Sequence, residues 1–229
     1  MQGIKEYLPL PKDARITDRQ NIKYPSVTTV LSGVDPIIFP EYKLRQYASR
    51  GSIVHAQAKH FLRTGKWEVN LLKIPRTEEE LKRMNQDLLI VTRGNLHLHW
   101  EDCNFLGFWE KYGKDFKPWK GGIGDDVFFN DQYVYSASPD WPCLYRDEPT
   151  IVEFKTCSNY PGAKVRKFKK QMSAYAKCEE DGVIKNLVLV PLNPKNKAGF
   201  GEPVIEKNIE DYFNLFIEDR LAFSAIFGI

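Results

Sequence analysis

The sequence has no apolar run that approaches the roughly 20 residues needed to cross a bilayer, so we expect no membrane-spanning helix. Its first twenty residues mix Lys, Arg, Asp and Glu, and they hold no apolar core of the kind that secretory signals contain. No internal repeat or low-complexity block appears. A cytoplasmic protein without a membrane partner is therefore the default expectation.

Cysteine is scarce, and the four residues, Cys103, Cys143, Cys157 and Cys178, form no CxxC pair and no Cys/His spacing typical of structural zinc. We predict four free thiols in a reducing compartment. The net charge of +3 is too small to indicate nucleic-acid binding by itself, because basic surfaces act through the clustering of their charges.

A chain of 229 residues with 42% apolar and 28% charged residues is long enough for one domain with a substantial core. We expect a single domain over 1–229. Its parts are an N-terminal arm (1–20), a mainly helical part (24–116), a sheet core (123–192) and a closing helix (207–229).

The N-terminal half has the pattern of helices. Residues 24–31 read as a short strand or a helix entry, and Pro40 opens a helical stretch over 41–64 that we expect to be interrupted near Gly51 and ended by Gly65. Thr77 and Glu80 form a capping box for a helix that should stop at Gly94. Another helix is expected over 99–116, before Pro118.

The C-terminal half alternates strands and helices. Residues 127–135 give a hairpin signal around Asn130 and Asp131, 150–156 and 186–192 read as strands, and 163–178 and 209–227 read as helices. The candidates for the buried side of the last helix are Tyr212, Phe213, Phe216, Ile217, Leu221 and Ile226. This order predicts an α/β fold with a central mixed β-sheet flanked by helices.

Charged residues in the apolar strand over 150–156 are the most informative feature of the chain. Glu153 and Lys155 lie two residues apart and so point to the same face, which is costly unless they act there. Asp140, which directly follows Pro139, lies thirteen residues before Glu153. Each has an ordinary alternative: Asp140 as a turn residue, Glu153 and Lys155 as the solvent face of an edge strand. Two carboxylates beside one lysine can instead hold Mg²⁺ and activate water for phosphodiester hydrolysis.

The helix that follows places Gln171 and Tyr175 one turn apart on one face, which also carries Lys167. Together, Asp140, Glu153-Phe154-Lys155 and Gln171 to Tyr175 resemble the PD-(D/E)xK nuclease superfamily, in particular its RecB-like exonuclease branch with a QxxxY motif. The resemblance covers roughly residues 24–190 and rests on the order and spacing of five pieces.

The two remaining pieces lie in the N-terminal half. Ser26-Val27-Thr28-Thr29 resembles the Ser-Val-Thr-Thr entry of the mitochondrial genome-maintenance and phage exonucleases, and Gly51 stands four residues before His55 as in their G-x-x-x-H helix. The resemblance makes His55 a site residue, Ser26, Thr28 and Thr29 DNA contacts, and the fold a restriction-endonuclease-like core with an N-terminal helical elaboration. His60, His97 and His99 match no motif.

Two departures from the family pattern stand out. Ala137 occupies a position where the family often has glycine, a minor change if the local φ is negative. The family also commonly adds an acidic metal ligand before its first aspartate, for which Asp125, Asp126 and Glu110 are the candidates.

As the resemblance implies, Asp140, Glu153 and the carbonyl of Phe154 would ligate Mg²⁺ or Mn²⁺, with Asp125 or Asp126 and His55 reaching a second ion or its waters. Lys155 would orient or deprotonate the attacking water, and Gln171 and Tyr175 would position Lys155 or the phosphate. Cations crowd the start of the same helix and suggest a phosphate track, although such runs are usually solvated. The DNA contacts expected there are Lys164, Arg166, Lys167 and Lys170, with Lys169 nearby.

These observations predict a metal-dependent DNA exonuclease that acts on ends or flaps in replication, recombination or repair, with single-stranded DNA preferred. A viral or phage source, and thus the host cytoplasm, is a natural setting. The alternatives are a processive 5′→3′ double-strand exonuclease of the phage recombination type and an inactive nuclease-fold DNA-binding module. A monomer is favoured. An iron–sulfur relative is disfavoured, because it needs a C-terminal cysteine cluster and no cysteine follows Cys178.

Overall fold

The computed structural model describes residues 7–36, 39–74, 76–93, 100–119, 126–178, 183–193 and 195–229. Its helices are α1 (Val27–Val34), α2 (Glu41–Thr64), α3 (Glu78–Arg93), α4 (Phe105–Tyr112), α5 (Gly162–Ala176) and α6 (Ile209–Phe227), with short 3₁₀ turns at Leu71–Lys73, Trp100–Asp102 and Gly113–Asp115. Its strands are β1 (Ile16–Arg19), β2 (Ile22–Pro25), β3 (Phe116–Pro118), β4 (Phe128–Asn130), β5 (Tyr135–Ala137), β6 (Trp141–Tyr145), β7 (Glu148–Lys155), β8 (Asn186–Pro191) and β9 (Val204–Glu206).

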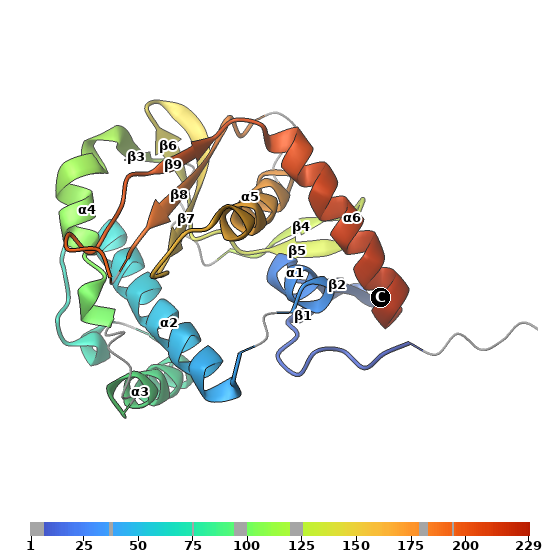
Figure 1. Cartoon of the computed structure of the whole chain (residues 1–229), viewed down its shortest axis with the longest axis horizontal. Coiled ribbons are helices and arrows are strands. Elements are labelled where there is room, and N and C mark those ends of the chain that lie inside the picture. Colours follow the sequence, from blue (N-terminus) through green and yellow to red (C-terminus); the bar gives the residue numbers. More distant parts are fainter. Residues whose placement is uncertain are drawn as a thin grey trace, which may run out of the picture.

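A five-stranded sheet in the order β3-β6-β7-β8-β9 forms the centre of the molecule. Strands β7 and β8 run parallel, connected through α5, whereas the other neighbouring pairs are antiparallel. Helices α1, α5 and α6 cover one face, and α2 and α4 cover the other, with α3 packed against α2 (Figure 1). The expected α/β fold with a mixed sheet flanked by helices is confirmed.

Alternation along β7 decides which side chains reach which helix layer. Ile151 joins the core under α1, α5 and α6, whereas Val152 and Phe154 join the core under α2 and α4. Glu153 and Lys155 share the parity of Ile151, so they point toward α5. The strand thereby presents Glu153 and Lys155 to the helix that carries Gln171 and Tyr175.

The expected break at Gly51 is wrong, because α2 runs unbroken for 24 residues. A glycine weakens a helix but does not end it when the flanking residues are buried, and Ile53 and Val54 are. Pro40 precedes the helix, and Gly65 ends it in the left-handed conformation with φ of 69° while its N–H donates to the carbonyl of Phe61.

The capping box at Thr77 is confirmed: its backbone N donates to Glu80 Oε2 at 2.9 Å, and the backbone N of Glu80 donates to Thr77 Oγ1 at 3.3 Å. The expected stop at Gly94 lies outside the described residues, and α3 ends at Arg93. The helix expected over 99–116 is shorter, because Asn104 caps α4 and Phe116 begins the edge strand β3.

The hairpin over 127–135 forms with a longer turn than expected. Strand β5 begins at Tyr135, one residue after Val134, which adopts a φ of 51° that interrupts the strand. Arg220 of α6 holds this turn through hydrogen bonds from Nε (3.1 Å) and Nη2 (2.9 Å) to the carbonyl of Val134.

The closing helix matches its expected bounds. Phe213 and Phe216 are buried as expected, but Leu221 is 64% exposed, and Arg220 and Phe223 are buried in its place. The hairpin β1–β2 and the strands β3, β6 and β9 were not expected from the sequence. Among the described residues, no helix is both long and apolar enough to span a membrane.

Candidate active site

Asp140 is fixed at the point where the connection from β5 enters β6. It is 6% exposed, and its Oδ2 accepts a hydrogen bond from the backbone N of Phe154 at 2.9 Å. Its Oδ1 lies 3.0 Å from Nδ1 of His55 on α2. A carboxylate with these contacts is held in one orientation at the carboxyl end of β7.

His55 bridges two oxygen acceptors. Its Nε2 lies 2.8 Å from the carbonyl oxygen of Phe154, while Nδ1 contacts Asp140. Neither an ionised carboxylate nor a carbonyl can donate a hydrogen bond, so a ring protonated on both nitrogens fits both contacts. Burial would lower the pKa of His55, but the charge and hydrogen bond of Asp140 outweigh it and raise the pKa.

Glu153 and Lys155 form a buried ion pair with Nζ to Oε1 at 2.5 Å. Glu153 is 3% exposed, and Gln171 Nε2 donates to the same Oε1 at 2.8 Å. Gln171 Nε2 also donates to the hydroxyl of Tyr175 at 2.6 Å. The charged pair on β7 and the QxxxY pair on α5 are thus joined by direct hydrogen bonds.

The surroundings shift the pKa values of Asp140 and Glu153 in opposite directions. Burial and then the charge of Asp140 raise the pKa of Glu153, despite Lys155. Burial would also raise the pKa of Asp140, but His55 and then Lys155 lower it to about 2. Burial lowers the pKa of Lys155, yet Glu153 and Asp140 raise it above its ordinary value. A cation bound nearby would therefore stabilise the ionised form of Glu153 more than that of Asp140.

The oxygen atoms available to a metal come from Asp140, Glu153 and the carbonyl of Phe154. Glu153 Oε2 is buried and has no hydrogen-bond partner, which is costly unless a cation occupies the space beside it. This orphaned atom and the all-oxygen donor set fit Mg²⁺ or Mn²⁺, with His55 a possible nitrogen ligand after loss of its Nε2 proton. Among the described residues, no group of three or more His, Cys, Asp or Glu stands together as a ready-made metal site.

The further acidic ligand is not supplied by the residues that the structure describes. Asp126 is exposed before β4, and Glu110 is exposed on α4, and neither contacts the cluster around Asp140. Asp125 lies outside the described residues. His60 lies further along α2, and His97 and His99 also lie outside the described residues.

The Ser-Val-Thr-Thr segment has a clear structural role. Ser26 is the N-cap of α1, and its Oγ accepts from the backbone N of Thr29 at 3.2 Å. Thr29 Oγ1 accepts from the backbone N of Arg15 at 2.8 Å, whereas Thr28 is exposed. This segment fixes α1 and the N-terminal arm, and its expected DNA contacts stay a prediction.

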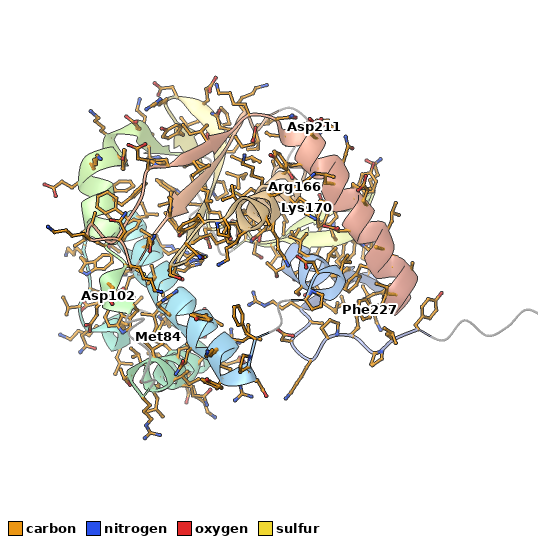
Figure 2. All side chains as sticks on the ribbon, in the orientation of Figure 1. Met84, Asp102, Arg166, Lys170, Asp211 and Phe227 are labelled. Carbon is orange, nitrogen blue, oxygen red and sulfur yellow. The ribbon has the colours of Figure 1, made fainter. Side chains whose placement is uncertain are left out.

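Three of the α5 cations are engaged by acidic residues from elsewhere in the chain. Lys167 Nζ lies 3.2 Å from Asp35, Lys169 Nζ lies 2.8 Å from Glu206, and Lys170 pairs with Asp219. Lys164 and Arg166 form no such pair among the described residues. Figure 2 places Arg166 and Lys170 on α5, on the side of the molecule where α6 begins at Asp211. Three of these five cations are thus engaged within the chain, and the DNA contacts expected on α5 stay a prediction.

The site residue that sequence reasoning missed is Arg50. It is 2% exposed, and its Nη2 donates to the carbonyl of Thr156, directly after Lys155. Tyr160 donates its hydroxyl to the carbonyl of Lys155. An arginine between Ser49 and Gly51 in a helix gave no local signal, because its partner is 106 residues away.

A scan against protein-family models and a search of curated proteins both found no match to this chain. In the geometry of the site, α2, β7, α5 and the segment just before β6 bring six residues into one network of contacts: His55, Asp140, Glu153, Lys155, Gln171 and Tyr175.

Proposed function

We propose that this protein is a metal-dependent DNA exonuclease of the PD-(D/E)xK type, which hydrolyses phosphodiester bonds at DNA ends or flaps. The observation that carries the proposal is the buried network of two carboxylates, one lysine and the Gln171–Tyr175 pair at the end of β7. Burying so many ionisable groups costs stability, and such groups gather at functional sites.

Asp140, Glu153 and the carbonyl of Phe154 would hold Mg²⁺ or Mn²⁺, with His55 beside them. The ion supplies charge stabilisation of the phosphate and an activated water when it is bound. Lys155 sits at the edge of this set with its ammonium held by Glu153, where it neutralises charge on the scissile phosphate and orients the attacking water. Gln171 keeps Glu153 in place, and Tyr175 keeps Gln171 in place.

A role in replication, recombination or repair, with single-stranded DNA preferred, completes the proposal. Incubation of the purified protein with 5′- and 3′-labelled oligonucleotides, linear and circular, single- and double-stranded, tests it in the presence of Mg²⁺, Mn²⁺ or EDTA. Metal-dependent loss of linear DNA only, with the label pattern giving the polarity, is expected. Processive degradation of duplex from the 5′ end would instead identify the phage recombination type.

Two substitutions test the site itself. Glu153→Ala and Lys155→Ala should each lower turnover by at least about 100-fold, the loss typical of removing one preorganised electrostatic group, while DNA binding persists. Glu148→Ala is the matched control, because Glu148 begins the same strand at the opposite end and is exposed. Wild-type cleavage by either site variant would refute the site, and DNA binding without any cleavage by the unaltered protein would identify an inactive binding module.

A further inference from the structure

A groove of about 480 Å³ runs between α2 and α3. Its lining includes His55, Lys59 and Arg63 from α2, and Arg76, Arg83 and Met84 from the α3 side. Met84, on α3 beside α2 in Figure 2, belongs to this lining and is buried. The walls of the groove carry polar and charged side chains over a small apolar base.

Basic side chains outnumber acidic ones more strongly in the groove than in the whole chain. Lys59, Arg63, Arg76 and Arg83 face two carboxylates, Glu80 and Asp87. Both carboxylates already accept hydrogen bonds within the chain: Asp87 Oδ1 from Ser49 Oγ at 2.9 Å, and Glu80 Oε2 from the backbone N of Thr77 at 2.9 Å. An excess of cations in a concave site attracts anionic ligands.

The groove opens onto the candidate active site through His55. This residue lines the groove and also contacts Asp140 and the carbonyl of Phe154. Lys59 and Arg63 follow His55 at intervals of four residues, so the three lie in a row along one face of α2, about 6 Å apart. The charge of Lys59 is among the causes that lower the pKa of Asp140. A strand that follows this row reaches the catalytic carboxylates.

We propose that the α2–α3 groove binds a single strand of DNA through its phosphates and leads it to the scissile position. The inference rests on the proposed nuclease function and names the substrate path. The groove volume lies within the roughly 300–1,000 Å³ of small-ligand sites, so it has room for a short piece of one strand.

The test compares two double variants that lose the same charge. Arg63→Gln with Arg83→Gln removes two exposed cations from the groove, and Arg146→Gln with Lys207→Gln removes two cations near the start of β7, at the opposite end of the sheet. Binding of a 5′-fluorescein oligo(dT) is measured by anisotropy in EDTA, with unlabelled single-stranded or duplex DNA as competitor, and cleavage is measured with Mn²⁺.

The groove variant should bind oligo(dT) at least about 10-fold more weakly, because the phosphates of the oligonucleotide lose two cationic partners. It should show a raised KM with kcat nearly unchanged. The control variant should stay within about 2-fold of the unaltered protein in both measurements. Equal behaviour of the two variants in a chain that does cleave DNA would overturn the groove and leave the nuclease function standing. Duplex competing as well as single-stranded DNA would overturn the single-strand assignment. Absence of both binding and cleavage in the unaltered protein would remove the proposed function itself.

Discussion

Glu153 combines two opposed properties in one side chain. Its Oε1 accepts from Lys155 and Gln171, while its Oε2 is buried without a partner. The unpartnered Oε2 is therefore a cost to the metal-free fold and would become favourable once a cation binds. A substitution of Glu153 therefore affects both the stability of the metal-free fold and metal binding, and unfolding with and without metal distinguishes the two effects.

Glu153→Gln keeps the shape of the side chain and removes its charge. Because the substitution leaves the ammonium of Lys155 without its charged partner, we expect the metal-free free energy of unfolding to fall, by at most about 3–5 kcal/mol. The unaltered protein should gain about 2.7 kcal/mol at a Mn²⁺ concentration 100 times its dissociation constant, and the variant should gain almost nothing. Thermal unfolding with and without Mn²⁺ measures both quantities.

Glu148→Gln, at the exposed start of the same strand, is the control and should keep the full gain from Mn²⁺. Equal stabilisation of Glu153→Gln by Mn²⁺ would show that Glu153 holds no metal.

At this scale, much of the candidate site follows from periodicity. The period of two along β7 puts Glu153 and Lys155 on one face, and the period of 3.6 along α5 stacks Gln171 and Tyr175, and the structure joins both pairs. The contacts of Arg50 and the ion pairs of the α5 lysines were not predictable, because each depends on a partner from a distant element.

At the scale of the element, α2 is the helix on which both proposals depend, since it carries His55 toward the site and Lys59 toward the groove. Its continuity through Gly51 can be tested. A Cβ at Gly51 would lie 3.6 Å from Thr156 Oγ1, an ordinary contact, so Gly51→Ala should raise the free energy of unfolding by about 0.5–1 kcal/mol. Urea unfolding checks this value.

Gly33→Ala on α1 provides a contrast of opposite sign. Its Cβ would lie 2.7 Å from Cε2 of Phe223 on α6, so overpacking should lower the free energy of unfolding by about 1–3 kcal/mol. Should Gly51→Ala destabilise the chain as Gly33→Ala does, α2 would not be the straight, continuous helix described.

Whether an element could be predicted depended on its length and its ends. The 19 residues of α6 have Asn208 as N-cap and Gly228 as C-cap, and both bounds were expected. Strand β6 has five residues and contains Pro142, which argues against a strand. The structure tolerates it because β3 pairs with β6 only from Cys143 to Tyr145, so Pro142 lies beyond the end of that neighbour. Such tolerance arises from tertiary pairing and leaves no local pattern.

At the scale of the whole molecule, the distribution of charge matters more than the net value of +3. Lys167, Lys169 and Lys170 of α5 pair with Asp35, Glu206 and Asp219, and the α2–α3 groove is lined by four basic and two acidic side chains. Basic residues thus hold elements together on one side of the sheet and would, as proposed, attract anions on the other.

This division predicts the salt dependence of DNA binding. Each phosphate contact on a single strand contributes a slope of about −0.7 to the logarithm of the binding constant against the logarithm of the salt concentration. Four groove cations therefore give about −3, and Arg63→Gln with Arg83→Gln should bring the slope to about −1.4. Lys164→Gln with Arg166→Gln on α5 should leave it near −3, measured by anisotropy from 50 to 300 mM salt. If the variant with Lys164→Gln and Arg166→Gln instead gave the shallower slope, the phosphate contacts would lie on α5, because counterion release reports only the cations that contact phosphates.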